Sequence, residues 1–403
     1  MRSAQSRDVS VSLTSFFMKC VGLWLASNRV EKYRRNFALI YTVVAILFAV
    51  WIQSMDLYYS WGDFGACIYI GCNISCLTMG LFKIFILFIH RKQFLSLITY
   101  MEQNFWHSNY DSREKMILDG WRRTCTYLIC FFTFFIQATL TCYAVRPLVA
   151  NIGKNASERI LPFNVWLDLP LTTSPYFEIT FIVQVLSTFH VGVCYFCFDN
   201  FLCIMNLNIA GQFCVLQYRL LNMHSVEDTG SQSETTNASP EKYYATFRGC
   251  IQYHQLLIAF CEKLQRVFRL IVLGQVLTFS LLICLVGYQA DLSSTRRLTF
   301  IFLLIGSMCQ LLMFTYSCDC LIQESTNIAS AAYAGPWLHL PMNKFGKMLR
   351  MDLMIMIMRS RRACCLTASG FFPVSLETYT GILSSAMSYF TILKQNTADA
   401  INT

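Results

Sequence analysis

The stretch GFFPVSLETYTGILSSAMSYFTILKQ, from Gly370 to Gln395, decides the fold of this chain. No proline follows Pro373, so the residues from Ser375 onward can form one helix of roughly 30 Å, the thickness of a bilayer's hydrocarbon core. Pro373 is expected to open that helix, because its ring fixes φ and it has no N–H to leave unbonded. The segment is therefore predicted to cross a membrane.

Polar side chains follow one face of this predicted helix. Ser384, Ser388, Thr391 and Gln395 recur at steps of four, three and four residues. A helix at membrane depth with one hydroxyl face either lines water or packs closely against other helices. We predict that it lines a pore, and the alternative is that the hydroxyls serve only helix packing.

Composition places the whole chain in a membrane. Its 403 residues would suit two or three soluble domains, but 55% of them are hydrophobic, only 14% are charged, and the mean hydropathy is +0.45. Soluble domains carry about 25% charged residues. We therefore predict an all-α polytopic membrane protein.

The 19 cysteines form neither a disulfide pattern nor a metal pattern. Most lie within apolar runs, where a thiol acts as a small hydrophobic group. Cys318 and Cys320, taken with Cys364 and Cys365, do not have the spacing of a zinc site. The sequence also lacks a His/Asp/Glu cluster, a Gly-rich phosphate loop and a nucleophile elbow. We predict no metal, no cofactor and no enzymatic activity.

Apolar runs of about 20 residues or more predict seven transmembrane helices. They cover about 36–55, 64–90, 124–146, 176–207, 264–288, 298–320 and 374–395. The second, fourth, fifth and sixth runs continue into more polar sequence, so these helices are expected to extend past the bilayer. All prolines lie outside the seven runs, so we expect no proline kink.

Basic residues predict the orientation. With the N-terminus inside, the inner segments and adjoining helix ends hold 25 Lys and Arg, whereas the outer ones hold 6. Cytoplasmic segments of membrane proteins carry the excess of these residues. We therefore predict a cytoplasmic N-terminus without a cleaved signal peptide and an extracellular C-terminus. The basic residues are spread over four inner segments, which argues against a nucleic-acid surface.

Two short motifs bear on the loops. Asn155-Ala-Ser157 lies in the predicted outer loop and is a candidate N-glycosylation site on the expected side. Asn237-Ala-Ser239 has the same pattern but is predicted to lie inside, so it is discounted. The polar, Ser/Thr-rich stretch 225–240 is predicted to be a disordered loop.

Several blocks toward the carboxyl end carry a family pattern. They are YAGPWLHLP (333–341), the basic amphipathic stretch 343–362, LTASG (366–370), VSLETY (374–379) and SYFT (388–391), with GQFCVL (211–216) and HQLL (254–257) upstream. Together they resemble the insect odorant receptors, most specifically over about 200–395. Where that family has a Gln-Lys-Pro-like turn, this chain has SRRA at 360–363.

The resemblance implies a ligand-gated, non-selective cation channel with four subunits around one pore. Tuned receptors of the family assemble with the shared co-receptor Orco, and this chain resembles a tuned receptor because it lacks the co-receptor's long inner loop. The implied setting is the plasma membrane of sensory dendrites, and the other implied partners are membrane lipid and a small volatile organic ligand. The implied pore face comprises Ser384, Ser388, Ile392 and Gln395, with Ile392 at a narrow hydrophobic gate near the outer mouth.

The resemblance also implies a ligand site in the outer half of the bilayer, among the second, third, fourth and sixth spans. A volatile ligand has few polar atoms, so its pocket needs apolar walls with one or two hydrogen-bonding groups. Helical spacing selects Ile70, Asn73, Ile74, Phe135, Thr139, Tyr143, Phe181, Gln184, Val185, Thr188, Leu304, Ser307 and Met308. The alternative for each is ordinary packing. Asn73 and Gln184 are the sharper predictions, because a buried amide needs a partner.

Three ionisable residues fall within the spans. His190 is expected near mid-membrane, and a neutral ring bonded to a neighbouring helix is favoured over a gating role. Lys83 and Asp199 are expected near the inner interface, where a long cation can reach water and an acid can pair, so both are interpreted as structural.

We divide the chain by expected role. Residues 1–207 form the ligand-binding bundle, 208–263 cytoplasmic helix extensions and the disordered loop, 264–340 the fifth and sixth spans, 341–372 a cytoplasmic anchor between subunits, and 373–403 the pore helix and outer tail. Two alternatives stay open. One is a gustatory-type receptor that forms a homomeric channel. The other is a G-protein-coupled receptor, disfavoured by the inside N-terminus and the absence of Asp-Arg-Tyr and Asn-Pro-x-x-Tyr motifs.

Overall fold

The computed structural model describes residues 9–26, 28–106, 110–155, 159–166, 171, 173–223, 240–292, 297–339 and 342–402. Within these ranges the helices are α1 (Val9–Val21), α2 (Arg29–Tyr59), α3 (Phe64–Ile89), α4 (Arg91–Met101), η1 (Glu102–Trp106), α5 (Ser112–Ala150), α6 (Tyr176–Leu221), α7 (Pro240–Leu292), α8 (Arg297–Ala334), η4 (Pro336–His339), α9 (Lys344–Ser360) and α10 (Leu376–Asn402). Nearly all of the loop predicted over 225–240 lies outside the described residues.

Each predicted span lies on one long helix, so the all-α fold with seven long helices is confirmed. Among the described residues, α2, α3, α5, α6, α7 and α8 are long and apolar enough to cross a membrane. α10 has 27 residues and is more polar than these six, in keeping with its many hydroxyl side chains. The amphipathic helices α1 and α4 were not foreseen, because they are too short to produce a hydropathy signal.

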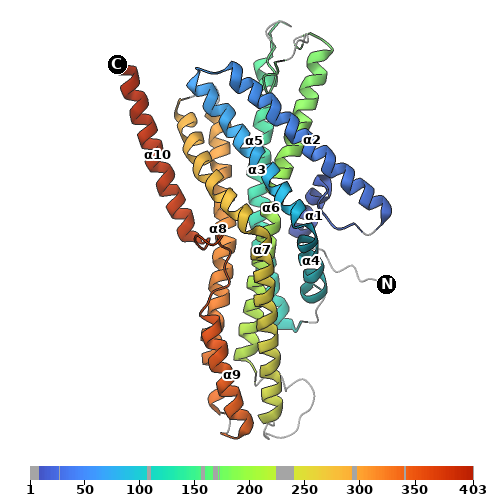
Figure 1. Ribbon diagram of the computed structural model, residues 1–403, viewed down its shortest axis with the longest axis vertical. Helices are drawn as coiled ribbons and strands as arrows, with labels where there is room; N and C mark the ends of the chain where they lie inside the picture. The colour runs from blue at the N-terminus through green and yellow to red at the C-terminus, as the bar shows by residue number, and fades with distance from the viewer. Residues whose placement is uncertain are drawn as a thin grey trace.

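The long helices form an elongated bundle (Figure 1). α2, α3, α5 and the first part of α6 lie in its upper part, and the lower part holds α9 beside the lower portions of α7 and α8. α10 stands at the edge, where it packs only one side against α7 and α8. This placement leaves a full face of α10 without a partner in the single chain.

Two helix ends differ from the prediction. α5 begins at Ser112, earlier than expected, because Asp111 and Glu114 form a reciprocal capping box with the backbone. At its other end α5 runs through Pro147 to Ala150. Pro147 still lies outside the predicted run 124–146, and it falls in the last turn of α5, where little helix remains to be disturbed.

Pro373 does not open the last helix, which corrects the prediction. It pairs with Thr367 in an isolated antiparallel bridge, while Val374 N–H donates to the Leu366 carbonyl at 2.9 Å. The intervening turn places Gly370 at φ +91°, a conformation that suits glycine. α10 starts only after this hairpin, at Leu376, so the hairpin sets the direction of the helix.

Aromatic packing holds the helices together. The rings of Phe94 in α4, Phe201 in α6 and Phe268 in α7 lie with centroids 4.8 to 6.3 Å apart, and each residue is 1% exposed. Burying a Phe side chain contributes about 1.5–3 kcal/mol. His190 of α6 is bonded across helices as expected, with its Nε2 2.8 Å from the Thr42 hydroxyl of α2.

A buried ion pair joins α3 to α6. Lys83 Nζ lies 2.9 and 2.8 Å from the two carboxylate oxygens of Asp199 and also donates to the Tyr195 carbonyl at 3.0 Å. Lys83 is 0% exposed and Asp199 is 3% exposed, and Gln310 of α8 donates to the same carboxylate. Lys83 therefore does not reach toward water, as a lysine near the interface can, but is neutralised inside the bundle.

Lys83→Met should destabilise the protein strongly. It leaves the Asp199 carboxylate buried without its cation, which typically costs about 3–5 kcal/mol. The measurement is the melting temperature of detergent-purified protein, followed by size-exclusion after heating. The double variant Lys83→Met/Asp199→Leu should recover most of the loss, because both charges are gone.

The exposed pair between Arg122 and Asp119 supplies the control. Asp119→Asn should shift the melting temperature little, because an exposed pair contributes only about 0–1 kcal/mol. If Lys83→Met had the same melting temperature as the unmutated protein, the structural role of the Lys83–Asp199 pair would be contradicted.

Candidate ligand cavity and pore face

A cavity of about 220 Å³ lies among α2, α3, α5, α6, α7 and α8. It sits toward the end of the bundle where α5 ends and α6 begins. Most of its lining is apolar, including Phe48 and Ile52 of α2, Leu77 of α3 and Ile136 of α5. Among the described lining residues none carries a charge. Such walls suit a small neutral molecule with few polar atoms.

Three hydroxyls on the cavity wall are occupied by their own helices. Thr139, Thr188 and Ser307 each donate to a carbonyl four residues earlier, at 2.9, 2.7 and 2.7 Å. This local bond uses the hydroxyl proton. These groups can still accept a hydrogen bond from a molecule in the cavity, but they do not require one.

Two amides on the wall have unmet hydrogen bonds. The Asn73 oxygen accepts from the Tyr143 hydroxyl at 3.2 Å, but its Nδ2 is buried without a partner among the described residues. Gln53 is 4% exposed, and its Oε1 is likewise buried without a partner. A buried polar atom left unbonded costs about 1–3 kcal/mol, so both groups favour an occupant that bonds to them.

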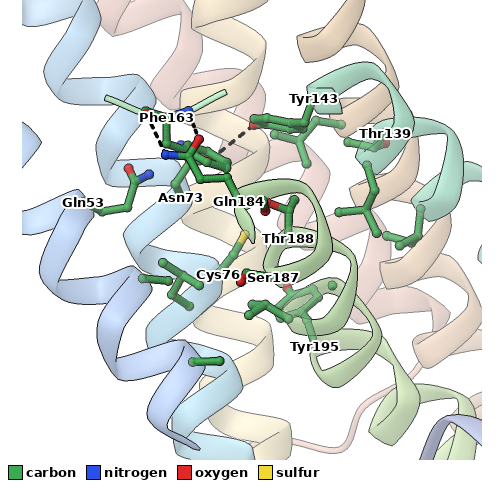
Figure 2. A pocket seen from close by; sticks show the side chains of 18 of the residues that line it. Gln53, Asn73, Cys76, Thr139, Tyr143, Phe163, Gln184, Ser187, Thr188 and Tyr195 are labelled. Atoms are coloured by element: carbon green, nitrogen blue, oxygen red, sulfur yellow. Dashed lines mark hydrogen bonds between the residues drawn. The ribbon is translucent and has the colours of Figure 1, made fainter. Parts of the chain in front are cut away.

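Gln184 is engaged differently. Its Oε1 accepts from the Phe163 backbone N–H at 3.1 Å, and its Nε2 donates to the Phe163 carbonyl at 3.0 Å. Figure 2 shows this paired contact at one end of the cavity, next to Tyr143. The Phe163 and Tyr143 rings stack with centroids 5.9 Å apart. Gln184 therefore holds the connecting segment over the cavity, with both its amide oxygen and its amide nitrogen engaged by Phe163.

The segment carrying Phe163 has a second attachment. The Trp166 indole donates to Asp56 of α2 at 3.0 Å, and the Asn164 amide donates to the same carboxylate at 3.2 Å. Asp56 is 4% exposed. We call residues 159–166 the cap segment, because these contacts hold it across the end of the cavity between α2 and α6.

On α10, the four predicted pore residues share one exposed face. Ser384, Ser388, Ile392 and Gln395 are all exposed in the single chain, and Ile392 is 54% exposed. The opposite face is packed, with Ile382 8% exposed and Ala386 3% exposed. The helix thus separates a packed apolar side from an open side that carries hydroxyls.

Lys394 lies off that open stripe. Its ammonium is 5.9 Å from the centre of the Phe390 ring. Phe390 packs beside Gly287 of α7, where a Cβ atom would lie 3.9 Å from the ring. The ammonium is thus directed toward the side of α10 that meets α7.

A family profile described as 7tm Odorant receptor matches residues 71–387. This chain belongs to the odorant receptor family. The family is one of membrane receptors and not of enzymes, and the protein is a multi-pass membrane protein.

Known odorant receptors resemble the chain over most of its length. Odorant receptor 10 of Aedes albopictus is 24% identical over 88% of this chain and 91% of its own. Odorant receptor 13a of Drosophila melanogaster is 25% identical over 76% of this chain and 74% of its own. The solved structure of olfactory receptor OR5 from Machilis hrabei in complex with eugenol superposes with a TM-score of 0.79 at 14% identity, covering 96% of this chain and 97% of that one. The fold is therefore shared.

In this odorant receptor the cavity brings together six of the thirteen predicted ligand residues. They are Asn73, Thr139, Tyr143, Gln184, Thr188 and Ser307. The other seven do not line it: Ile70, Ile74, Phe135, Phe181, Val185, Leu304 and Met308. Phe135, for example, packs edge to face against Phe131 and Phe134, with ring centroids 4.9 and 5.6 Å away.

Sequence reasoning missed the contribution of α2 and of the cap segment. α2 supplies Ala45, Phe48, Ala49, Ile52 and Gln53, and the cap segment supplies Phe163. Gln53 had a detectable signal, because it is a lone amide near the end of the first apolar run, the same kind of signal that singled out Asn73. Phe163 had none, since nothing in a loop sequence shows where the loop folds back.

Gln184→Leu should release the cap segment. The substitution removes both hydrogen bonds to the Phe163 backbone and leaves the helix intact. Amide hydrogen exchange across residues 159–166, measured on purified protein, should quicken by about tenfold or more, because two bonds of roughly 1 kcal/mol each are lost.

Thr188→Val, one turn further along α6, is the matched control and should leave exchange in the cap segment unchanged. If the cap segment exchanged its amide hydrogens equally slowly in Gln184→Leu and in the unmutated protein, the Gln184 hydrogen bonds would not be what holds the segment.

Proposed function

We propose that this odorant receptor is a subunit of a ligand-gated, non-selective cation channel in the plasma membrane. It binds a small volatile molecule in the cavity and opens a pore lined by α10. The observation that carries this proposal is the exposed hydroxyl stripe on α10, opposite a packed apolar face. An open polar face on a membrane-crossing helix is favourable where water or further subunits cover it.

Ile392 fits a gate within such a pore. It is a large aliphatic side chain on the open face, near the carboxyl end of α10. A ring of aliphatic side chains from several subunits can close a pore by excluding water. Ser384 and Ser388, lower on the same stripe, would keep the rest of the pathway wet.

The cavity supports the ligand-binding role. Its apolar walls and unmet amides match the chemistry of a small volatile organic molecule. The related receptor OR5 was solved with eugenol, a small molecule, and shares this fold. The predicted ligand residues that line the cavity thus become the proposed ligand contacts, together with Gln53 of α2.

The packing offers a route from cavity to pore. α8 lines the cavity with Gly306, Ser307 and Gln310, and it also packs against α10. α7 lines the cavity at Leu282 and packs against α10 near Gly287. A ligand that favours one arrangement of α7 and α8 over another would therefore bias the position of α10.

α9 supports assembly with other subunits. Leu349, Leu353 and Met356 are buried against the chain, whereas Met351 and Met354 are 60% and 62% exposed. An apolar face left open on a helix outside the membrane-crossing segments calls for a protein partner. We propose the co-receptor Orco and other subunits of a tetramer as that partner. Residues 341–372 then serve as the anchor, 1–207 as the ligand-binding bundle, and 373–403 as the pore helix and tail.

The proposed orientation places the N-terminus in the cytoplasm and Asn155 outside the cell. Asn155 is exposed, as glycan attachment requires. Asn155→Gln should abolish the mobility shift that a glycan-removing enzyme causes in protein from insect cells. Asn237→Gln is the matched control and should leave the shift intact. A shift that survives Asn155→Gln and disappears with Asn237→Gln would reverse the orientation.

The channel is tested by cysteine substitution on α10. Expressed with Orco, the receptor should give ligand-evoked cation current, and Ser388→Cys and Ile392→Cys should make that current sensitive to a charged thiol reagent applied in water. Ala386→Cys, on the packed face, should stay insensitive, and the unmutated chain reports the background from its own cysteines.

Two results would decide against this assignment. If the current through both Ser388→Cys and Ile392→Cys receptors were insensitive to the reagent, α10 would not line the pore. Full current without Orco would favour a homomeric, gustatory-type channel.

A further inference from the structure

We propose that the cavity selects neutral ligands bearing a hydroxyl group, held between Asn73 and Gln53 beneath Phe163, with the apolar part directed toward Tyr195. This inference rests on the proposed function and specifies the ligand chemistry of that same site. It follows from which polar groups on the cavity wall are occupied and which are not.

Most polar groups on the wall already have partners. The hydroxyl protons of Thr139, Thr188 and Ser307 are used within their own helices. The Gln184 amide bonds to the cap segment through both its oxygen and its nitrogen. The Tyr195 hydroxyl accepts from Gln275 of α7 at 3.3 Å.

The floor of the cavity is also satisfied. Gln310 donates to Asp199, whose charge is neutralised by Lys83. No charge is left over in this network for a ligand ion to balance. Because an unpaired charge is costly to bury, a charged ligand would find no counterion in the described lining.

Among the buried polar atoms of the described lining, the two exceptions are Asn73 Nδ2 and Gln53 Oε1, whereas the Ser187 side chain is only half-buried. The structure leaves a donor, Asn73 Nδ2, and an acceptor, Gln53 Oε1, buried and unpartnered on the wall of the same cavity. A hydroxyl group can accept from the first and donate to the second. A ketone or ester oxygen can only accept, so it satisfies one of the two, and an alkane satisfies neither.

The choice of a hydroxyl also holds when both amides are turned. A half-turn of an Asn or Gln side-chain amide exchanges its oxygen and nitrogen positions. With both amides turned, Asn73 presents an oxygen and Gln53 a nitrogen, and a hydroxyl still donates to one and accepts from the other. A carbonyl oxygen would face an amide oxygen in some of these orientations and repel it.

The positions of the polar groups also define how the ligand is oriented in the cavity. In Figure 2, Gln53, Asn73 and Gln184 lie near Phe163, whereas Tyr195 lies at the other end of the cavity. The hydroxyl would therefore sit under the cap segment and the carbon skeleton would extend along the apolar wall. At about 220 Å³, the cavity is smaller than pockets for drug-sized molecules, roughly 300–1,000 Å³, so a short chain or a single ring fits it.

The test uses size-matched sets of an alcohol, a methyl ketone and an alkane, from four to eight carbons, together with benzyl alcohol, acetophenone and ethylbenzene. Receptor is expressed with Orco, and the concentration for half-maximal current is measured for each compound. In the set that contains the most potent compound, the alcohol should reach half-maximal current at a concentration about tenfold lower than the ketone does. The alkane should require a higher concentration than either.

Asn73→Leu and Gln53→Leu should each reduce that tenfold preference to less than about threefold, because an apolar side chain of similar size makes no demand for a hydrogen bond. The matched controls are Thr78→Val and Ser54→Ala. Both residues are exposed, lie on the same two helices and are outside the cavity lining. Neither control should change the ratio between alcohol and ketone.

Each outcome bears on the proposal. A ketone or alkane that matches its alcohol in the unmutated receptor overturns the ligand class, as does an unchanged ratio in both Leu variants. If a variant fails to reach the surface, the comparison within the unmutated receptor decides. If no compound evoked a current, with receptor and Orco verified at the cell surface, the result would count against the proposal that the protein is a ligand-gated channel.

Discussion

The structure depends first on the cost of leaving backbone N–H and C=O groups unbonded in hydrocarbon. A chain of this composition meets that constraint by forming helices, whose backbone bonds are closed within each segment. Departures from helix are then confined to places outside the apolar runs. The hairpin that joins Thr367 to Pro373 is one of them, and it aims α10 along the edge of the bundle.

With the backbone satisfied, buried polar side chains carry the particular character of this receptor. Lys83 and Asp199 neutralise each other and bind α3 to α6, and Gln310 ties α8 to the same centre. Gln184 fastens the cap segment. Asn73 and Gln53 differ because each keeps a buried atom without a partner. The buried polar groups that are fully bonded hold the cavity walls in place, whereas the unbonded atoms of Asn73 and Gln53 favour the binding of a polar ligand group.

Hydropathy could predict the seven long helices because burial in lipid selects apolar residues whatever their neighbours are. Hydropathy could not separate the candidate ligand residues that line the cavity from those that do not. Asn73 and Ile74 are adjacent in sequence, yet only Asn73 lines the cavity, since successive helical residues point about 100° apart. Gln184 shows a further limit: a buried amide signals that a partner exists, but not that the partner is the backbone of Phe163.

By itself, the sequence determined the helical class, the seven long segments, the hydroxyl stripe on the last of them and the family pattern near the carboxyl end. These are local properties, set by composition and by the 3.6-residue period. Only the tertiary structure decided that α2 and the cap segment help to enclose the cavity and that one face of α10 stays open. Those outcomes depend on contacts between residues far apart in the chain, such as Asp56 with Trp166, and no local pattern encodes such a pairing.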